Sequence, residues 1–224
     1  MVIAMFFGMS RSLGTVPAPY SWIANAALIA QFPLVHSALL TNRGRRLLAR
    51  LAPRGTGTTL ATTTFATIAA LQVLALFALW SPSGTVWWQA HGAALVVLVV
   101  MYATSWLLLG KSMMDAGLAL QTGSLGWIAM LRGRQPVYPV MPQTGLFRLT
   151  RHPIYVSFAL TLWTVPTWTP DQLVIAVVFT AYCVRAPLLK EARFRRMYGS
   201  AFDDYARGVP YWLPRPGFRT TKRR

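Results

Sequence analysis

Residues 55–110 read GTGTTLATTTFATIAALQVLALFALWSPSGTVWWQAHGAALVVLVVMYATSWLLLG, without a single Asp, Glu, Lys or Arg. A stretch this long and apolar needs hydrocarbon around it, since a helix crosses a bilayer in about 20 residues. The connection from Ser81 to Val86 divides it in two. The stretch therefore predicts two membrane-spanning helices joined by a turn.

Further apolar segments flank this stretch on both sides. Ser12 to Asn42 contains no charged residue, and between Arg151 and Arg185 the only one is Asp171. The last two spans are expected to be short and to form a helical hairpin. The sequence thus predicts an all-α, polytopic integral membrane helical bundle with about five transmembrane helices. The predicted spans are Tyr20 to Leu40, Thr59 to Trp80, Trp87 to Leu109, Ile154 to Thr167 and Gln172 to Leu189.

The composition of the whole chain agrees with a membrane protein. Its 224 residues include 22 Lys and Arg but only 5 Asp and Glu, a net charge of +17, and 54% are hydrophobic while 12% are charged. Soluble domains have about a quarter charged residues, and disordered basic tails lack apolar ones, so both classes are excluded. We predict a single membrane-embedded domain at 20–214, between an N-terminal stub at 1–19 and a basic tail at 215–224.

The distribution of cations predicts the orientation of the bundle. Five lie in segment 41–57, five in 110–152 and eleven from Arg185 onward, whereas the two other connections contain none. Basic loops face the cytoplasm, so the N-terminus lies outside. Tryptophans beside the cation-free turns are typical of an outer interface: Trp80, Trp87, Trp88, Trp163 and Trp168. We expect a multi-pass protein of a bacterial inner membrane whose active site faces the cytoplasm.

Several kinds of chemistry are disfavoured. Cys183 is the only cysteine, so no disulfide framework exists. The three histidines, His36, His91 and His152, are too scattered for a sequence-local metal motif, and no metal is predicted. The cations flank apolar spans and suit anionic lipid head groups, so membrane lipids are the expected partners and nucleic acid is not.

The first block that carries functional groups is Arg151-His152-Pro153-Ile154-Tyr155, directly before an apolar span. Pro153 suits the first turn of a helix, which places His152 at the cap. A helix start offers free N–H groups and favours a carboxylate or phosphate. The alternative is that Arg151 only extends to lipid phosphates while His152 only caps the helix.

The second block runs from Lys190 to Tyr205, with Val209-Pro210 after it, and contains Glu191, the only glutamate of the chain. Glu191 is placed where the last span emerges. It is either neutralised by nearby cations or serves as a counter-charge for a cationic ligand. The nearby cations are Arg185, Lys190, Arg193, Arg195 and Arg196.

Together the two blocks resemble the isoprenylcysteine carboxyl methyltransferase and phospholipid methyltransferase superfamily. In this sequence, the residues that match the signature of the superfamily are Arg151 to Ser157, Lys190-Glu191, Tyr198-Gly199, Phe202, Tyr205 and Val209-Pro210. The sequence is most similar to the methanethiol S-methyltransferase branch, to which NnrU-like proteins are related. His36-Ser37, Arg132-Gly133-Arg134 and Trp163 to Pro166 carry that closer likeness.

The resemblance implies a membrane methyltransferase that uses S-adenosyl-L-methionine and most closely fits S-methylation of a small thiol such as methanethiol. It assigns catalysis to Arg151 and Glu191, and His36 is the candidate base because it lies at the cytoplasmic end of a span. The alternative is that His36 only bonds a backbone carbonyl or an interfacial water. The resemblance assigns the cofactor to Arg151, His152, Pro153, Tyr155, Glu191 and Tyr205. Arg151, His152 and Pro153 would hold the methionine end, the two tyrosines would wall the pocket, and Glu191 would balance cationic charge or orient Arg151.

Three departures from the family pattern keep alternatives open. Ser157 replaces a glycine, Lys190 replaces the first acid of a Glu-Glu pair, and the N-terminus lacks a complete first span. One alternative is a methyltransferase for prenylcysteine carboxylates, lipids or secondary metabolites. Another is a non-catalytic membrane accessory or transport protein of the same fold. The expected partner in the leading interpretation is a small or lipophilic methyl acceptor, and the oligomeric state is left open.

Overall fold

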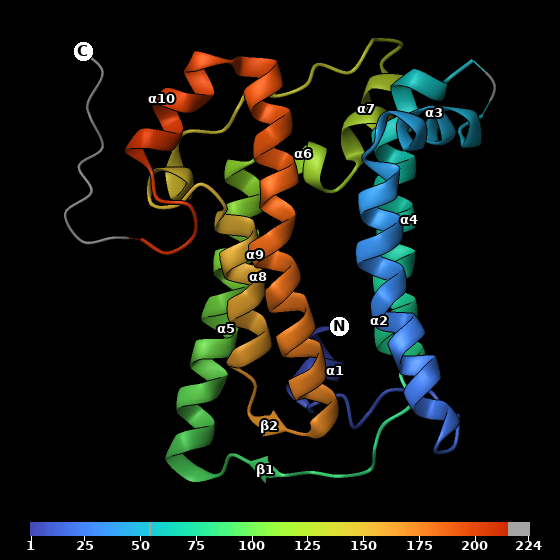
Figure 1. Cartoon of the computed structure of the whole chain (residues 1–224), viewed down its shortest axis with the longest axis vertical. Coiled ribbons are helices and arrows are strands. Elements are labelled where there is room, and N and C mark those ends of the chain that lie inside the picture. The colour runs from blue at the N-terminus through green and yellow to red at the C-terminus, as the bar shows by residue number, and fades with distance from the viewer. Residues whose placement is uncertain (54, 215–224) are drawn as a thin grey trace.

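The computed structural model describes residues 1–53 and 55–214, and nearly all of its regular structure is helical (Figure 1). The N-terminal half contains α1 (Val2–Phe6), α2 (Tyr20–Leu39), α3 (Asn42–Leu51), α4 (Gly57–Leu79), β1 (Trp88–Gln89) and α5 (Gly92–Asp115). The C-terminal half contains α6 (Leu118–Gln121), α7 (Ser124–Leu131), the 3-10 helix η1 (Gly145–Arg148), α8 (Pro153–Trp163), β2 (Thr167–Trp168), α9 (Pro170–Tyr198) and α10 (Ser200–Gly208). The predicted basic tail lies outside the described residues.

Four of these helices are long and apolar enough to cross a membrane, namely α2, α4, α5 and α9. The fifth predicted span is α8, a shorter apolar helix of 11 residues. At about 1.5 Å per residue it covers roughly half of a hydrocarbon core about 30 Å thick. The predicted all-α polytopic membrane bundle is confirmed.

The predicted length of the last span is wrong. The segment expected at Gln172 to Leu189 is part of a helix of 29 residues, Pro170–Tyr198. Residues with high helix propensity, including Lys, Glu, Ala and Arg, follow the apolar part, so the helix continues beyond the end of the hydrophobic pattern. Because α9 continues in this way, Glu191 lies on a rigid helix and not in a loop.

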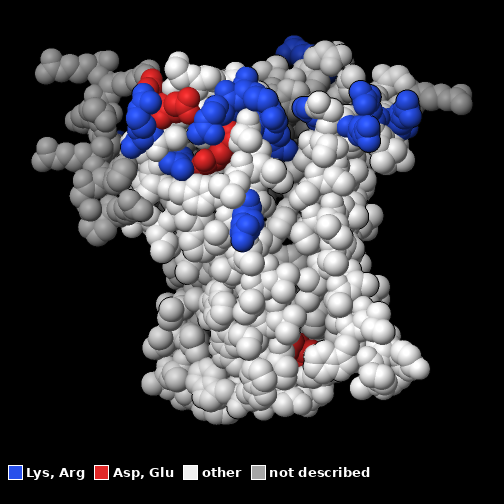
Figure 2. Space-filling model, in the orientation of Figure 1, with Lys and Arg blue, Asp and Glu red and all other residues white. Residues whose placement is uncertain are grey.

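The two cation-free turns meet at one end of the bundle. Strand β1 pairs antiparallel with β2, with Trp88 opposite Trp168, and the backbone N–H of Trp87 donates to the carbonyl of Trp168 at 2.9 Å. Lys and Arg gather at the other end, which carries α3, α7 and α10 (Figure 2). The predicted separation of basic loops from tryptophan-rich turns therefore exists in three dimensions.

The helices form two groups. Helices α2 and α4 pack together and support α3 and α7, while α8 packs between α5 and α9 (Figure 1). Between the groups, the ring of Phe32 on α2 lies 5.8 Å from the ring of Phe179 on α9. Since Pro153, Glu191 and α10 all belong to the second group, that group holds most of the predicted site.

The N-terminal segment packs into the core of the bundle. Met5 and Met9 are completely buried. The hydroxyl of Tyr102 on α5 donates to the carbonyl of Val2 at 2.7 Å, and the hydroxyl of Thr169 donates to the carbonyl of Gly8. A segment too short to cross the membrane thus fills space among the helices near the paired turns.

Asp171 is a buried acid at the end of the paired turns. One carboxylate oxygen accepts from the indole N–H of Trp80 at 3.0 Å. The other accepts from the backbone N–H and the hydroxyl of Ser83, at 3.0 and 2.6 Å. A carboxylate that lies two residues into α9 therefore ties that helix to the end of α4.

Replacing Asp171 with Ala is expected to lower the free energy of unfolding in detergent by about 2–3 kcal/mol, because it leaves buried donors without an acceptor. Denaturant titration monitored by tryptophan fluorescence measures the change. Asp203→Ala is the control, since Asp203 pairs with Arg195 at the exposed surface and such pairs contribute little. Equal, small effects of the two changes would contradict a structural role for Asp171.

Candidate active site

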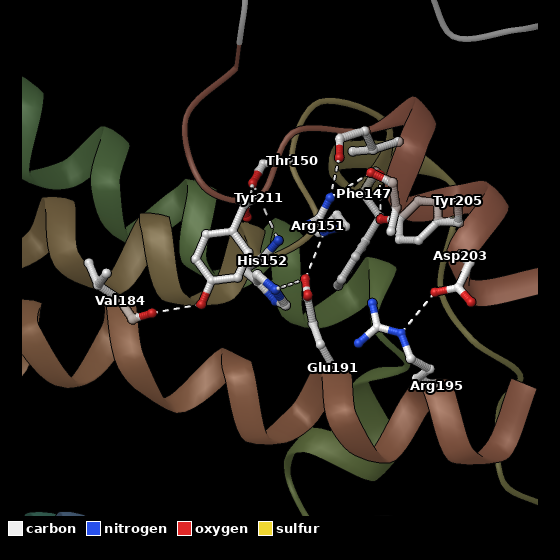
Figure 3. Close-up of polar contacts among 12 residues, drawn as sticks. Phe147, Thr150, Arg151, His152, Val184, Glu191, Arg195, Asp203, Tyr205 and Tyr211 are labelled. Carbon is white, nitrogen blue, oxygen red and sulfur yellow. Dashed lines mark hydrogen bonds and ion pairs between the residues drawn. The ribbon is translucent and has the colours of Figure 1, made fainter. Parts of the chain in front are cut away.

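Glu191 on α9 is bonded to two residues that lie some forty positions earlier in the chain (Figure 3). Nε of Arg151 donates to Oε1 of Glu191 at 2.7 Å, and Nε2 of His152 lies 2.8 Å from the same oxygen. All three side chains are largely withdrawn from solvent, with 14%, 3% and 11% exposed for Arg151, His152 and Glu191. The hairpin thus brings the two sequence blocks into one buried cluster.

Among the described residues, the cations next to Glu191 in sequence form no ion pair with it. Arg195 pairs with Asp203 at 2.8 Å instead. Nζ of Lys190 lies 5.7 Å from the ring centre of Phe147 and 5.3 Å from that of Phe194. Consecutive helical residues point about 100° apart, so Lys190 and Glu191 face different neighbours. The ion pairs of Glu191 are therefore formed with Arg151 and His152 and not with the cations beside it in the chain.

Arg151 also holds the chain that follows α10. Its Nη1 donates to the carbonyls of Ala206 and Val209, at 2.7 and 2.8 Å, and its backbone N–H donates to the carbonyl of Pro210 at 2.9 Å. A planar guanidinium suits several acceptors in fixed directions. The Val209-Pro210 pair of the second block therefore supplies backbone acceptors for the arginine of the first.

One atom of each charged partner remains available. Both bonds to Glu191 end at Oε1, and within the described residues no hydrogen bond reaches Oε2. The bonds of Arg151 leave from Nε and Nη1, and none leaves from Nη2. Oε2 of Glu191 and Nη2 of Arg151 are thus an acceptor atom and a donor atom without a hydrogen bond among the described residues.

His152 is the cap of α8, with Pro153 in its first turn, as predicted. Its ring packs edge-on against Tyr155 and Tyr211, with ring centres 6.0 and 4.9 Å apart. Burial raises the pKa of Glu191, but the hydrogen bonds with His152 and Arg151 outweigh this and lower that pKa, so Glu191 is a carboxylate that only accepts and Nε2 of His152 donates to it. Nδ1 of His152 is buried and has no hydrogen-bond partner within residues 1–53 and 55–214. Burial lowers the pKa of His152, and the hydrogen bond to Glu191 acts in the opposite direction.

The lowered pKa of His152 predicts how stability depends on pH. The unfolded chain binds a proton at this residue more readily than the folded protein does, so the folded state loses stability as pH falls below about 6.5 and gains nothing further well above it. We expect a lower thermal midpoint in detergent at pH 5 than at pH 7.5, and a smaller difference for His152→Gln. An identical pH dependence in both proteins would contradict the assignment.

The two predicted tyrosines occupy different walls of the cluster. The hydroxyl of Tyr205 on α10 donates to the carbonyl of Phe147 at 2.7 Å (Figure 3). Tyr155 lies on α8 beside His152. Burial raises the pKa of Tyr205, so its hydroxyl stays protonated and serves as a donor. The structure thus places the predicted cofactor residues on one end of the second helix group.

His36 lies on α2, in the other helix group. Its ring stacks on Phe32 at 5.0 Å and leans on Phe65 at 4.8 Å, and its Nδ1 is buried without a partner. It makes no hydrogen bond with the other candidate residues among those the structure describes. Among the described residues, His36 is therefore not joined to the ion-pair cluster by a hydrogen bond.

Tyr211 was missed by the sequence reasoning. Its ring contacts His152, the guanidinium carbon of Arg151 lies 5.5 Å from its centre, and its hydroxyl donates to the carbonyl of Val184 at 2.7 Å (Figure 3). The only sequence signal for Tyr211 was an aromatic residue directly after Val209-Pro210.

Ser157, which replaces a glycine of the family pattern, contacts a neighbouring helix. Its hydroxyl oxygen lies 3.2 Å from the hydroxyl oxygen of Ser112 on α5, so Ser157 serves helix packing.

Comparison with known proteins places this geometry in context. Methanethiol S-methyltransferase 2 of Bradyrhizobium diazoefficiens is 26% identical over 86% of this chain and 73% of its own length. Methanethiol S-methyltransferase of a Pseudomonas species is 26% identical over 93% of this chain and 80% of its own length. Nurim of Mus musculus is 32% identical over 52% of this chain and 47% of its own length.

No family model matches the chain, and no solved structure matches it. The two methanethiol S-methyltransferase alignments extend over most of this chain, whereas the alignment with Nurim covers about half of it. The resemblance predicted from the two blocks is therefore confirmed, and this chain is a relative of the methanethiol S-methyltransferases.

Proposed function

We propose that the protein is an integral membrane methyltransferase that uses S-adenosyl-L-methionine to S-methylate a small thiol. The observation that carries the proposal is the Arg151–Glu191 pair, whose Nη2 and Oε2 atoms make no hydrogen bond with the described part of the chain. The amino-acid end of this cofactor has a carboxylate and an ammonium, which match a free guanidinium nitrogen and a free carboxylate oxygen. The names of the relatives support the methyl-transfer chemistry.

In this proposal the residues of the cluster bind and orient the donor. Nη2 of Arg151 holds the carboxylate, and Oε2 of Glu191 accepts from the ammonium. Pro153 starts α8, while Tyr155 and Tyr205 exclude water from the two sides. When bound, the cofactor supplies a methyl group on a positively charged sulfur, which is reactive toward a correctly placed nucleophile. Positioning and exclusion of water then supply much of the catalysis.

The acceptor is proposed to be a small or lipophilic thiol that partitions into the bilayer. The cluster lies on helices whose other faces are apolar and exposed, so such an acceptor can approach from lipid. His36, on α2, is proposed to line the acceptor side. The cations at this end of the bundle support a site that faces the cytoplasm of a bacterial inner membrane, where the water-soluble donor is made available.

Feeding cells with small thiols tests the acceptor. Cells that express the protein are expected to release the methylated volatile into the headspace when methanethiol is supplied, and cells that express Glu191→Ala are not. Labelled methyl groups in the lipid fraction, without a volatile product, would favour a lipid or prenylcysteine acceptor. Saturable binding of the donor by the purified protein in detergent separates any enzyme from a non-catalytic accessory protein.

A further inference from the structure

We infer that His152, held by Glu191, is the general base that removes the proton of the acceptor thiol. The inference rests on the proposed function, and it moves the role of base from His36 to His152. A thiolate is the nucleophilic form, whereas a free alkyl thiol is mostly protonated near neutrality. Thiol methylation therefore needs a neutral, oriented acceptor for that proton.

The geometry of the cluster leaves one atom of His152 for this task. Nε2 donates to Oε1 of Glu191 at 2.8 Å, which fixes the ring and its tautomer. In the neutral ring the opposite nitrogen, Nδ1, then carries a lone pair. Nδ1 is buried and accepts no hydrogen bond from the described residues. A buried acceptor without a donor costs about 1–3 kcal/mol, and an S–H group placed there would offset that cost.

The groups around His152 suit a base that charges only during the reaction. Burial and the cations of Arg151 and Lys190 favour the neutral ring, while Glu191 stabilises the charged one. Tyr155 and Tyr211 face the ring with their edges and exclude water. Glu191 thus acts as a positioning residue that lowers the cost of forming the imidazolium.

His36 lacks such support. Its ring is packed against Phe32 and Phe65, and no carboxylate lies within ion-pairing distance among the described residues. A proton taken up at His36 would create a buried charge without a counter-charge, which is strongly unfavourable. Both histidines have a buried, unpartnered Nδ1, but only His152 has an acid bonded to its other nitrogen.

The step balances as follows. The S–H bond of the thiol breaks and its proton forms a bond with Nδ1 of His152. The electron pair of the thiol sulfur forms a bond with the methyl carbon, and the bond between that carbon and the donor sulfur breaks, with its electrons staying on the donor sulfur. The products are a methyl thioether, S-adenosylhomocysteine and an imidazolium, which returns its proton to water.

The test compares two acceptors within one preparation of each variant, so that the amount of folded protein cancels. One acceptor is an alkanethiol that is protonated at the assay pH, and the other is an aryl thiol that is already ionised. His152→Gln keeps a donor for Glu191 but has no titrating nitrogen. We expect it to reduce the rate with the alkanethiol by on the order of 10²-fold or more and with the aryl thiolate by less than about 10-fold.

His36→Gln is the matched variant, and it is expected to change the rates with both acceptors by the same factor. Donor affinity is measured for each variant by calorimetry. An equal loss on both acceptors for His152→Gln, with weakened donor binding, would overturn the base assignment and leave His152 as a donor-binding residue. If the unaltered protein binds the donor but methylates neither thiol, the proposed function fails and this inference fails with it.

Discussion

Glu191→Gln is expected to weaken the binding of S-adenosyl-L-methionine by about 2–5 kcal/mol, the range seen when one partner of a buried, hydrogen-bonded charge pair is removed. The amide keeps the shape of the side chain but removes its charge. Arg151 and the cationic donor would then share a site with no counter-charge, and one amide oxygen must replace two carboxylate oxygens. The turnover of any thiol is expected to fall with the affinity.

Calorimetric titration of the detergent-solubilised protein measures this affinity. Asp203→Asn is the matched control, because it also neutralises an acid of the C-terminal block but lies at the surface, where it pairs with an exposed arginine. We expect its donor affinity to stay within about twofold of the unaltered protein. Binding that survives Glu191→Gln unchanged would remove the main support for the proposed donor site.

Arg151→Lys is expected to be nearly as damaging although the charge is kept. Arg151 bonds Glu191 through Nε and the carbonyls of Ala206 and Val209 through Nη1. A lysine ammonium is a compact charge on a flexible stem and cannot reproduce this planar fork. We expect a loss of about 2–4 kcal/mol in the free energy of unfolding, since each hydrogen bond to a charged group contributes about 1.5–3 kcal/mol and lysine recovers part of them.

Denaturant titration and donor binding are both measured for Arg151→Lys. The control is Arg195→Lys, whose side chain is 54% exposed, and we expect a change below about 0.5 kcal/mol for it. Because Arg151 ties the end of α10 to the site, limited proteolysis is also expected to cut the chain after α10 faster in the variant. Unaltered stability and binding in Arg151→Lys would show that the charge alone matters.

Much of the scaffold could be predicted because membrane insertion depends on local composition. Apolar length and the absence of charge located α2 and α4 to within about two residues and α5 to within about six, and the cation-free turns proved to be neighbours, joined as β1 and β2. The end of α9 was predicted too early because its apolar pattern ends near Leu189, whereas the helix continues to Tyr198. The burial of Met5 and Met9 gave no sequence signal, since the segment is too short to register as a span.

The sequence named the residues of this cluster and one of their contacts, but not the others. The two blocks identified Arg151, His152 and Glu191, and the resemblance implied that Glu191 orients Arg151, but no pattern predicted the bond between Glu191 and His152. Tyr211 also contacts His152, and the sequence did not predict this contact. Ion pairs depend on which side chains converge from separate segments, and spacing along one helix predicts only its own faces.

By itself, the sequence determined that this is an all-α membrane bundle with its charge at one end, because the energy of placing residues in hydrocarbon depends on composition along the chain. Only the tertiary structure decided that one oxygen of Glu191 binds both Arg151 and His152. That choice sets the tautomer of His152 and leaves its Nδ1 unpartnered in a buried place. Such details arise from directional contacts a few ångströms long between segments far apart in sequence, which no one-dimensional pattern encodes.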